Sequence, residues 1–171
     1  MEIEKLIKDI MTASSEDLFA VEVEDGEFYL KDYMEKVRKY YEPKCRLVMT
    51  KLEIGEYGNR LLEGDMDKAL EVMGNLMENA LKYGDGKKIR ISFYEEDSCQ
   101  VIRVFNTGIP VAREEMPHLF DSFYRGSNAG DKDGNGLGLY IGREMMRKMG
   151  GDLFAERAED GMGGCLVFTL K

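Results

Sequence analysis

The sequence predicts an α/β protein, a two-layer sandwich in which a mixed, mostly antiparallel five-stranded sheet is backed by about three helices. Three observations carry this prediction. The chain has 171 residues, 43% of them hydrophobic, which is enough to bury one ordinary core. Five segments read as strands, and two of these alternate clearly with a period of two. Other segments place apolar residues at helical spacing instead, so helices and strands share the core.

Apolar residues at helical spacing predict helices over residues 2–13, 27–41, 66–84 and about 136–148. The second is expected to end before Pro43, because proline cannot continue a helix. Asp65 is suited to capping the third helix, since its side chain can accept from the unpaired amides of the first turn. Gly84 is suited to ending that helix.

The five predicted strands cover residues 46–54, 87–96, 99–106, 151–158 and 163–170. The second and third flank Glu96, Asp97 and Ser98, which predicts a hairpin. Residues 107–135 are rich in glycine and proline and are expected to form a loop.

Composition excludes several classes of function. The net charge of −9 argues against a surface that binds nucleic acid or anionic lipid, because such partners need clustered Lys and Arg. Cys45, Cys99 and Cys165 are odd in number and far apart, so neither a disulfide framework nor a zinc site is indicated, and a reducing cytosol is expected. No apolar run approaches the roughly 18 to 20 residues that span a bilayer.

The stretch that begins at Asp131, DKDGNGLGLYIGREM, has three familiar interpretations, and each fails. A calcium loop needs a bidentate Glu at its last position, where Gly142 stands. A dinucleotide loop needs a preceding strand and a third glycine, where Leu139 stands. A P-loop needs Gly-Lys followed by Ser or Thr. What remains is G-x-G-x-G before an apolar helix, which suits either a polyphosphate or an ordinary glycine-rich turn.

A second polar pattern lies on the predicted helix at 66–84. Asn75, Asn79 and Lys82 fall within an arc of about 60°, at roughly 100° per residue, opposite the apolar residues of that helix. Amide oxygens can ligate Mg²⁺, which favours phosphates as further ligands, and Lys82 could neutralise those phosphates. Taken alone, the pattern fits a solvated helix face equally well.

Four segments in this order resemble the N box, first glycine box, F box and second glycine box of sensor histidine kinases: NLMENALKYG (75–84), FNTGIP (105–110), HLFDSFYRGSN (118–128) and DGNGLGLYI (133–141). The resemblance covers about residues 25–171. It implies the Bergerat fold of the GHKL superfamily, which includes gyrase and Hsp90-type ATP-binding domains. It also implies ATP and Mg²⁺ as cofactors, held between the N-box helix and a lid at about residues 121–135.

By this resemblance, the catalytic residues are Asn75, Asn79, Lys82 and Arg125. Asn79 is the Mg²⁺ ligand that bridges the ion to the triphosphate, and Asn75 lies one turn earlier. Lys82 contacts phosphate, Tyr83 lies near the ribose or base, and Arg125 reaches the γ-phosphate.

The other boxes imply further nucleotide-binding residues. Phe120 and Phe123 resemble the anchors of the lid. The remaining positions belong to the two glycine boxes, with phosphate-cradling glycines in the second: Asn106, Gly108 and Pro110, then Gly134, Gly136, Leu137, Gly138 and Leu139.

The chain departs from the family pattern at three places. Asn106 stands where the family has an Asp that accepts from the adenine amino group, so we expect weaker but not absent binding. Pro110 replaces a glycine and stiffens the turn. Cys165 stands where Thr or Ser is frequent, which puts a water-mediated adenine contact there in doubt.

Asn75 distinguishes a kinase from a hydrolase. Hydrolytic relatives have Glu at this position, because a carboxylate can take the proton from an attacking water and an amide cannot. The chain's one histidine, His118, precedes the F box and is expected at the surface or packed on the lid. The phosphoacceptor histidine is therefore expected on a dimerisation domain outside this sequence.

The resemblance also implies organisation and partners. Residues 1–20 are expected to be the end of a helical dimerisation hairpin or a linker, and residues 21–171 the catalytic domain. The partners would be the dimerisation and phosphoacceptor domain of the parent kinase and a response regulator, with the fragment monomeric. The domain would be cytoplasmic in a parent anchored in the cell membrane. Two alternatives stay open: a GHKL ATPase of another class, and a degenerate interaction module that no longer binds nucleotide.

Overall fold

The computed structural model describes residues 22–121 and 138–171. The predicted helix at 2–13 and nearly all of the expected lid lie outside these ranges. The elements run in the order β1 (Glu27–Tyr29), α2 (Leu30–Leu47), β2 (Lys51–Ile54), β3 (Leu61–Glu63), α3 (Met66–Tyr83), β4 (Lys88–Glu96), β5 (Cys99–Thr107), η2 (Arg113–His118), α4 (Gly138–Lys148), β6 (Asp152–Ala158) and β7 (Gly161–Thr169).

The main sheet has five strands in the order β2-β4-β5-β7-β6. β2 runs parallel to β4, and every other neighbouring pair is antiparallel. The predicted mixed, mostly antiparallel five-stranded sheet is therefore confirmed. The predicted hairpin joins β4 to β5 through Asp97 and Ser98, whose φ angles of 52° and 61° suit a two-residue turn.

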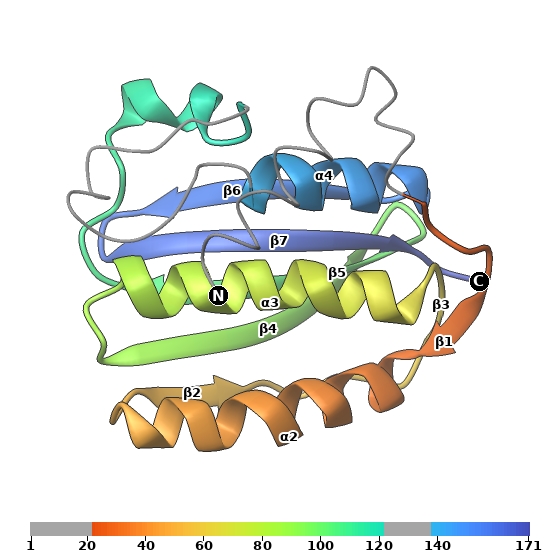
Figure 1. Cartoon of the computed structure of the whole chain (residues 1–171), viewed down its shortest axis with the longest axis horizontal. Helices are drawn as coiled ribbons and strands as arrows, with labels where there is room; N and C mark the ends of the chain where they lie inside the picture. Colours follow the sequence, from red (N-terminus) through yellow and green to blue (C-terminus); the bar gives the residue numbers. More distant parts are fainter. Residues whose placement is uncertain (1–21, 122–137) are drawn as a thin grey trace.

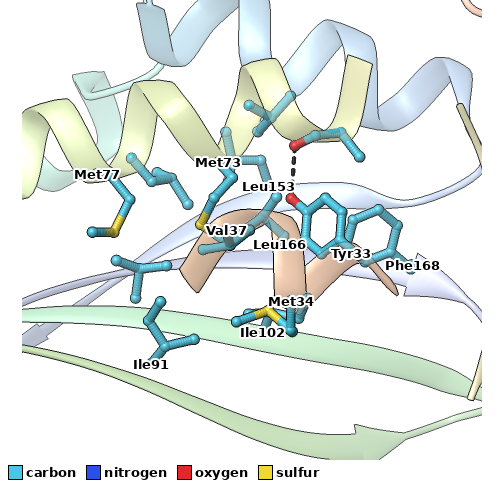
Figure 2. Close-up of a cluster of buried hydrophobic side chains, with 14 of the residues drawn as sticks. Tyr33, Met34, Val37, Met73, Met77, Ile91, Ile102, Leu153, Leu166 and Phe168 are labelled. Atoms are coloured by element: carbon cyan, nitrogen blue, oxygen red, sulfur yellow. Dashed lines mark hydrogen bonds between the residues drawn. The ribbon is translucent and has the colours of Figure 1, made fainter. Parts of the chain in front are cut away.

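Three helices pack over one face of this sheet, with α3 between α2 and α4 (Figure 1). The core lies between the two layers, where side chains such as Met73, Met77 and Ile91 are fully buried (Figure 2). Within the core, the hydroxyl of Tyr33 in α2 donates to the carbonyl oxygen of Ala69 in α3 at 2.7 Å and so links the two helices. In the described part of the chain, none of the helices combines the length and apolarity that a bilayer crossing requires.

The sequence analysis missed a small second sheet. Glu27–Tyr29, predicted as the start of a helix, forms β1, which pairs antiparallel with β3. Phe28 and Leu62 are partners in this register and both are buried, so the pair closes one end of the core.

The predicted end of the second helix at residue 41 was also wrong, because α2 continues through Pro43 to Leu47. The buried residues Tyr33, Val37 and Tyr41 recur every four positions, and Cys45 extends that stripe beyond the proline. Burial of this stripe outweighs the hydrogen bond lost at Pro43. The predicted strand at 46–54 is correspondingly shortened to β2.

The third helix agrees with its prediction. The Asp65 side chain accepts from the backbone N–H of Lys68 at 3.2 Å, and α3 ends at Tyr83, directly before Gly84. A short 3-10 helix of six residues, η2, lies within the predicted loop. α4 begins at Gly138, the first residue described after the gap.

Candidate nucleotide-binding site

Helix α3 carries the first set of predicted site residues. One face buries Val72, Met73 and Met77 in the core. Asn75, Asn79, Lys82 and Tyr83 are half-buried at the border of that face. The Asn79 side chain makes no hydrogen bond with another described residue, so its amide oxygen is free to ligate a cation.

Asn75 joins α3 to the start of α4. Its side-chain nitrogen donates to the carbonyl oxygen of Gly138 at 3.2 Å. A Cβ added at Gly138 would lie 3.7 Å from Cγ of Asn75, which is an ordinary contact. The N box and the end of the second glycine box, separated by more than 60 residues, are thus in direct contact.

The other end of α3 contacts the first glycine box. The backbone N–H of Asp85 donates to the carbonyl oxygen of Thr107 at 2.9 Å. The backbone N–H of Gly108 donates to the backbone carbonyl oxygen of Asp160 at 2.8 Å. Gly108 has a φ of +142°, and a Cβ there would lie 3.0 Å from the Asp85 nitrogen. Only glycine suits this backbone conformation and this close approach.

Asn106 lies at the same end, on the face of the sheet that the helices cover, because its register partner is the buried Ile89. Its side-chain nitrogen donates to the carbonyl oxygen of Thr107 at 3.2 Å. That nitrogen would also lie 2.9 Å from a Cβ added at Gly84, so the amide rests against the end of α3.

These contacts define the two ends of a candidate site along one helix. Asn75 and Gly84 are nine residues apart, which corresponds to about 13 Å along the α3 axis. Asn79 and Lys82 lie between them. This span and its order of groups suit an extended nucleoside triphosphate, with phosphates near Gly138 and the base near Asn106.

Only part of the lid is described. Phe120 is partly buried against the core, and the Arg143 guanidinium of α4 lies 5.0 Å from its ring. Leu139 is likewise packed against the core, and Pro110 is half-buried after the exposed Ile109. The other predicted residues of this region lie outside the described ranges: Phe123, Arg125, Gly134, Gly136 and Leu137.

Two carboxylate groups near α3 have clear partners. Glu78, next to Asn79, forms an ion pair with Lys44 of α2. The Thr107 hydroxyl lowers the pKa of Asp85, and the backbone N–H of Lys87 lowers it further. The sequence analysis missed the pairing of Asp85 with Thr107, because the two residues are far apart in the chain.

Two other residues that the sequence analysis singled out have clear side-chain partners. Cys165 follows the strand period and points to the face opposite α3, where its thiol donates to Glu156 at 2.9 Å. Burial raises the pKa of this thiol. His118 is exposed in η2, with Nδ1 2.9 Å from a carboxylate oxygen of Asp121. The side chain of Cys165 therefore points away from Asn106 and from the face of the sheet that α3 covers.

A hollow of about 550 Å³ lies beside the two-stranded sheet, between residues that include Val23, Gly64 and Met149. Of the residues predicted for the nucleotide site, none of those that the structure describes lines it.

Comparison with known proteins agrees with the fold. The family model described as "Histidine kinase-, DNA gyrase B-, and HSP90-like ATPase" matches residues 64–171. The sensor histidine kinase WalK of Bacillus subtilis is 36% identical over 136 residues, covering 73% of this chain and 22% of WalK. The sensor histidine kinase RcsC of Escherichia coli is 30% identical over 175 residues, covering 98% of this chain and 18% of RcsC.

Among solved structures, the catalytic domain of the histidine kinase ThkA superposes with a TM-score of 0.73 at 26% identity, covering 85% of this chain and 95% of that domain. The chain belongs to the histidine kinase, DNA gyrase B and HSP90-like ATPase family. Within it, the chain is an ATP-binding catalytic domain of the sensor histidine kinase type. It spans about a fifth of the length of WalK and RcsC.

Proposed function

We propose that this domain binds Mg·ATP along α3 and positions the γ-phosphoryl group for transfer to a histidine on the dimerisation domain of its parent kinase. The observation that carries the proposal is the pair of contacts at the two ends of α3, from Asn75 to Gly138 and from Asp85 to Thr107. They bring three of the four sequence boxes together around one helix.

In this proposal, Asn79 holds the magnesium ion, whose charge would be shared with the triphosphate oxygens when it is bound. Lys82 and the start of α4 supply positive potential, since the first amides of a helix carry partial positive charge. Arg125 and the glycines of the second box would complete the phosphate contacts, and Phe120, whose ring lies beside Arg143 of α4, would anchor the lid. Catalysis is then positioning and charge stabilisation, as in other phosphoryl transfers.

Asn75 supports transfer rather than hydrolysis. Its side chain is an amide, and its nitrogen is already committed to the carbonyl of Gly138. It has no group that could take a proton from water. Glu78 lies three residues later on the same helix, and its ion pair with Lys44 holds it toward α2.

A calorimetric titration with a non-hydrolysable ATP analogue tests binding. Saturable heat is expected with Mg²⁺ present. Asn79→Ala should lose the magnesium-dependent part of the affinity, whereas Asn79→Asp, which keeps an oxygen ligand, should retain it. Glu71→Ala, at an exposed position two turns earlier on α3, is the matched control. No heat from the unmodified domain at millimolar nucleotide would favour a degenerate interaction module instead.

Incubation with γ-labelled ATP tests the reaction. The domain alone should not label itself, because the phosphoacceptor histidine is expected on a separate dimerisation domain. Label should appear on a separately supplied dimerisation domain of the parent kinase. Steady phosphate release without an acceptor, abolished by Asn79→Ala, would instead identify an ATPase of another class.

The proposal extends to the parent protein. WalK and RcsC are much longer than this chain. ThkA has been crystallised in complex with the response regulator TrrA, in an assembly whose kinase matches this fold with a TM-score of 0.77. We infer a longer kinase that is anchored in the cell membrane and passes its phosphoryl group to a response regulator. The present domain would act in the cytoplasm and be monomeric when isolated.

A further inference from the structure

Asp85 and Thr107 form a reciprocal pair at the end of α3. The backbone N–H of Asp85 donates to the Thr107 carbonyl at 2.9 Å. In return, the Thr107 hydroxyl lies 2.7 Å from a carboxylate oxygen of Asp85 and donates to it. Hydrogen bonds to an ionised acceptor are stronger than neutral ones, so this pair is a firm link between α3 and β5.

Neighbouring backbone groups hold the pair in place. The backbone N–H of Lys87 donates to the same Asp85 oxygen at 2.9 Å, and that of Lys88 donates to the Thr107 hydroxyl oxygen at 3.2 Å. The Thr107 hydroxyl also holds the pKa of Asp85 below its usual range, so the carboxylate is charged at neutral pH.

The same Thr107 carbonyl orients Asn106. It accepts from the Asn106 side-chain nitrogen at 3.2 Å as well as from Asp85. A carbonyl oxygen can only accept, so the nitrogen of the amide must face it. The amide oxygen of Asn106 is thereby turned the other way.

We propose that Asp85 and Thr107 are positioning residues that hold Asn106 with its oxygen toward the base and so give the site its preference for adenine over guanine nucleotides. This inference rests on the proposed nucleotide site. Adenine carries an amino donor at its 6-position, which an amide oxygen can accept. Guanine carries a carbonyl acceptor there, which would face a second acceptor.

The pair compensates for the departure at Asn106. A carboxylate presents an oxygen in either orientation, but an amide presents an oxygen or a nitrogen according to how it is turned. Without a fixed Thr107 carbonyl, the Asn106 amide could turn its nitrogen toward the 6-carbonyl of guanine. Loss of the pair should therefore reduce discrimination more than it reduces total purine binding.

The experiment compares the dissociation constants of ADP and GDP by calorimetry in the intact 171-residue chain. Thr107→Val removes the hydroxyl at nearly constant shape, and Thr107→Ser restores it. The native chain should prefer ADP. Thr107→Val should reduce the GDP-to-ADP ratio of dissociation constants about fivefold, which corresponds to one ordinary hydrogen bond. Thr107→Ser should return the ratio to near the native value.

Asp85→Ala provides a second route, because Asp85 is exposed and its loss leaves the core intact. It should reduce the same ratio, while Asp67→Ala, an exposed change at the other end of α3, should not. A native ratio in folded Thr107→Val and Asp85→Ala would overturn the inference and leave the nucleotide site standing. Absence of binding of both nucleotides to the native chain would overturn the site and the inference together.

Discussion

Replacement of Gly138 by alanine should separate nucleotide binding from folding. A Cβ at this position would lie 3.7 Å from Cγ and 3.9 Å from Oδ1 of Asn75, and it meets no closer atom of residues 22–121 or 138–171. These are ordinary van der Waals distances. Alanine is also favoured over glycine inside helices by about 0.5 to 1 kcal/mol. The free energy of unfolding should therefore stay the same or rise slightly.

Binding should respond differently. If phosphate oxygens approach the backbone at Gly138, a methyl group beside Asn75 occupies the space that they need. Loss of one hydrogen bond to a charged group costs about 1.5 to 3 kcal/mol. Because each 1.4 kcal/mol is tenfold in affinity, the dissociation constant of Mg·ATP should rise about 10-fold to 100-fold.

Gly142, one turn later on α4, is the matched control. A Cβ there would lie 3.2 Å from a methyl carbon of Leu153 and 3.5 Å from Val72, inside the core, and would meet the Asn75 side-chain nitrogen only at 4.0 Å. Gly142→Ala should lower the melting temperature with little effect on affinity, the reverse of Gly138→Ala. Thermal unfolding and calorimetric titration of both variants give the comparison. A folded Gly138→Ala variant with native affinity would refute a phosphate site at the start of α4.

Four further substitutions test separate contacts. Gly84→Ala places a Cβ 2.6 Å from the carbonyl oxygen of the preceding helical turn, so denaturant titration should show a loss of about 1 to 3 kcal/mol together with weaker nucleotide binding. Tyr33→Phe removes a buried 2.7 Å hydrogen bond and should cost about 1 to 2 kcal/mol while leaving affinity unchanged. Burial raises the pKa of Asp152, but the backbone N–H of Leu153 and nearby arginines outweigh it, and the pKa is lowered. The ionised Asp152 therefore stabilises the fold above its unfolded pKa of about 4, and this stabilisation is lost as the pH falls through the lower folded pKa. The free energies of unfolding of the native chain and of Asp152→Asn should therefore converge in acid. Lys44→Met leaves Glu78 unpaired, and calorimetry should show Mg·ATP affinity reduced at low salt and recovering at high salt.

Local signals made part of the fold predictable. Residues close together in the sequence determine the Asp65 cap, the buried apolar face of α3 and the alternation of β4 and β5. All three elements agree with their predictions. β1 and β3 have three residues each, and their pairing links segments more than 30 residues apart. Neither strand has enough residues to show an alternation of buried and exposed side chains. Their pairing depends instead on the burial of Phe28 against Leu62.

Pro43 shows how a strong local rule fails. The proline signal predicted a helix end, yet Cys45 continues the buried four-residue spacing of α2. A longer window would have revealed that spacing. For Cys165 the strand period was sufficient, because Cys165 and Leu166 are consecutive buried residues of β7 and therefore point to opposite faces of the sheet.

The motifs predict which residues form the site, but they do not predict the hydrogen bonds that position those residues. Neither the hydrogen bond from Asn75 to Gly138 nor the pairing of Asp85 with Thr107 has a sequence signature, since each joins residues distant in the chain. Both depend on how α3 lies against α4 and β5. The sequence could therefore indicate the chemistry of the site, while its geometry required the packed fold.

The net negative charge of the chain opposes the binding of an anion such as a triphosphate, but the charges near α3 are arranged differently from the net charge. A chain with a net charge of −9 repels a triphosphate over long distances. Near α3, however, the one carboxylate of the N-box segment, Glu78, is paired with Lys44. Lys82 and the first amides of α4 contribute positive potential beside Asn79 and Asn75, while the carboxylate of Asp85 adds a negative charge only at the far end of the helix. Because exposed charges beyond about 10 Å are screened in physiological salt, this local arrangement rather than the net charge governs whether the anion binds.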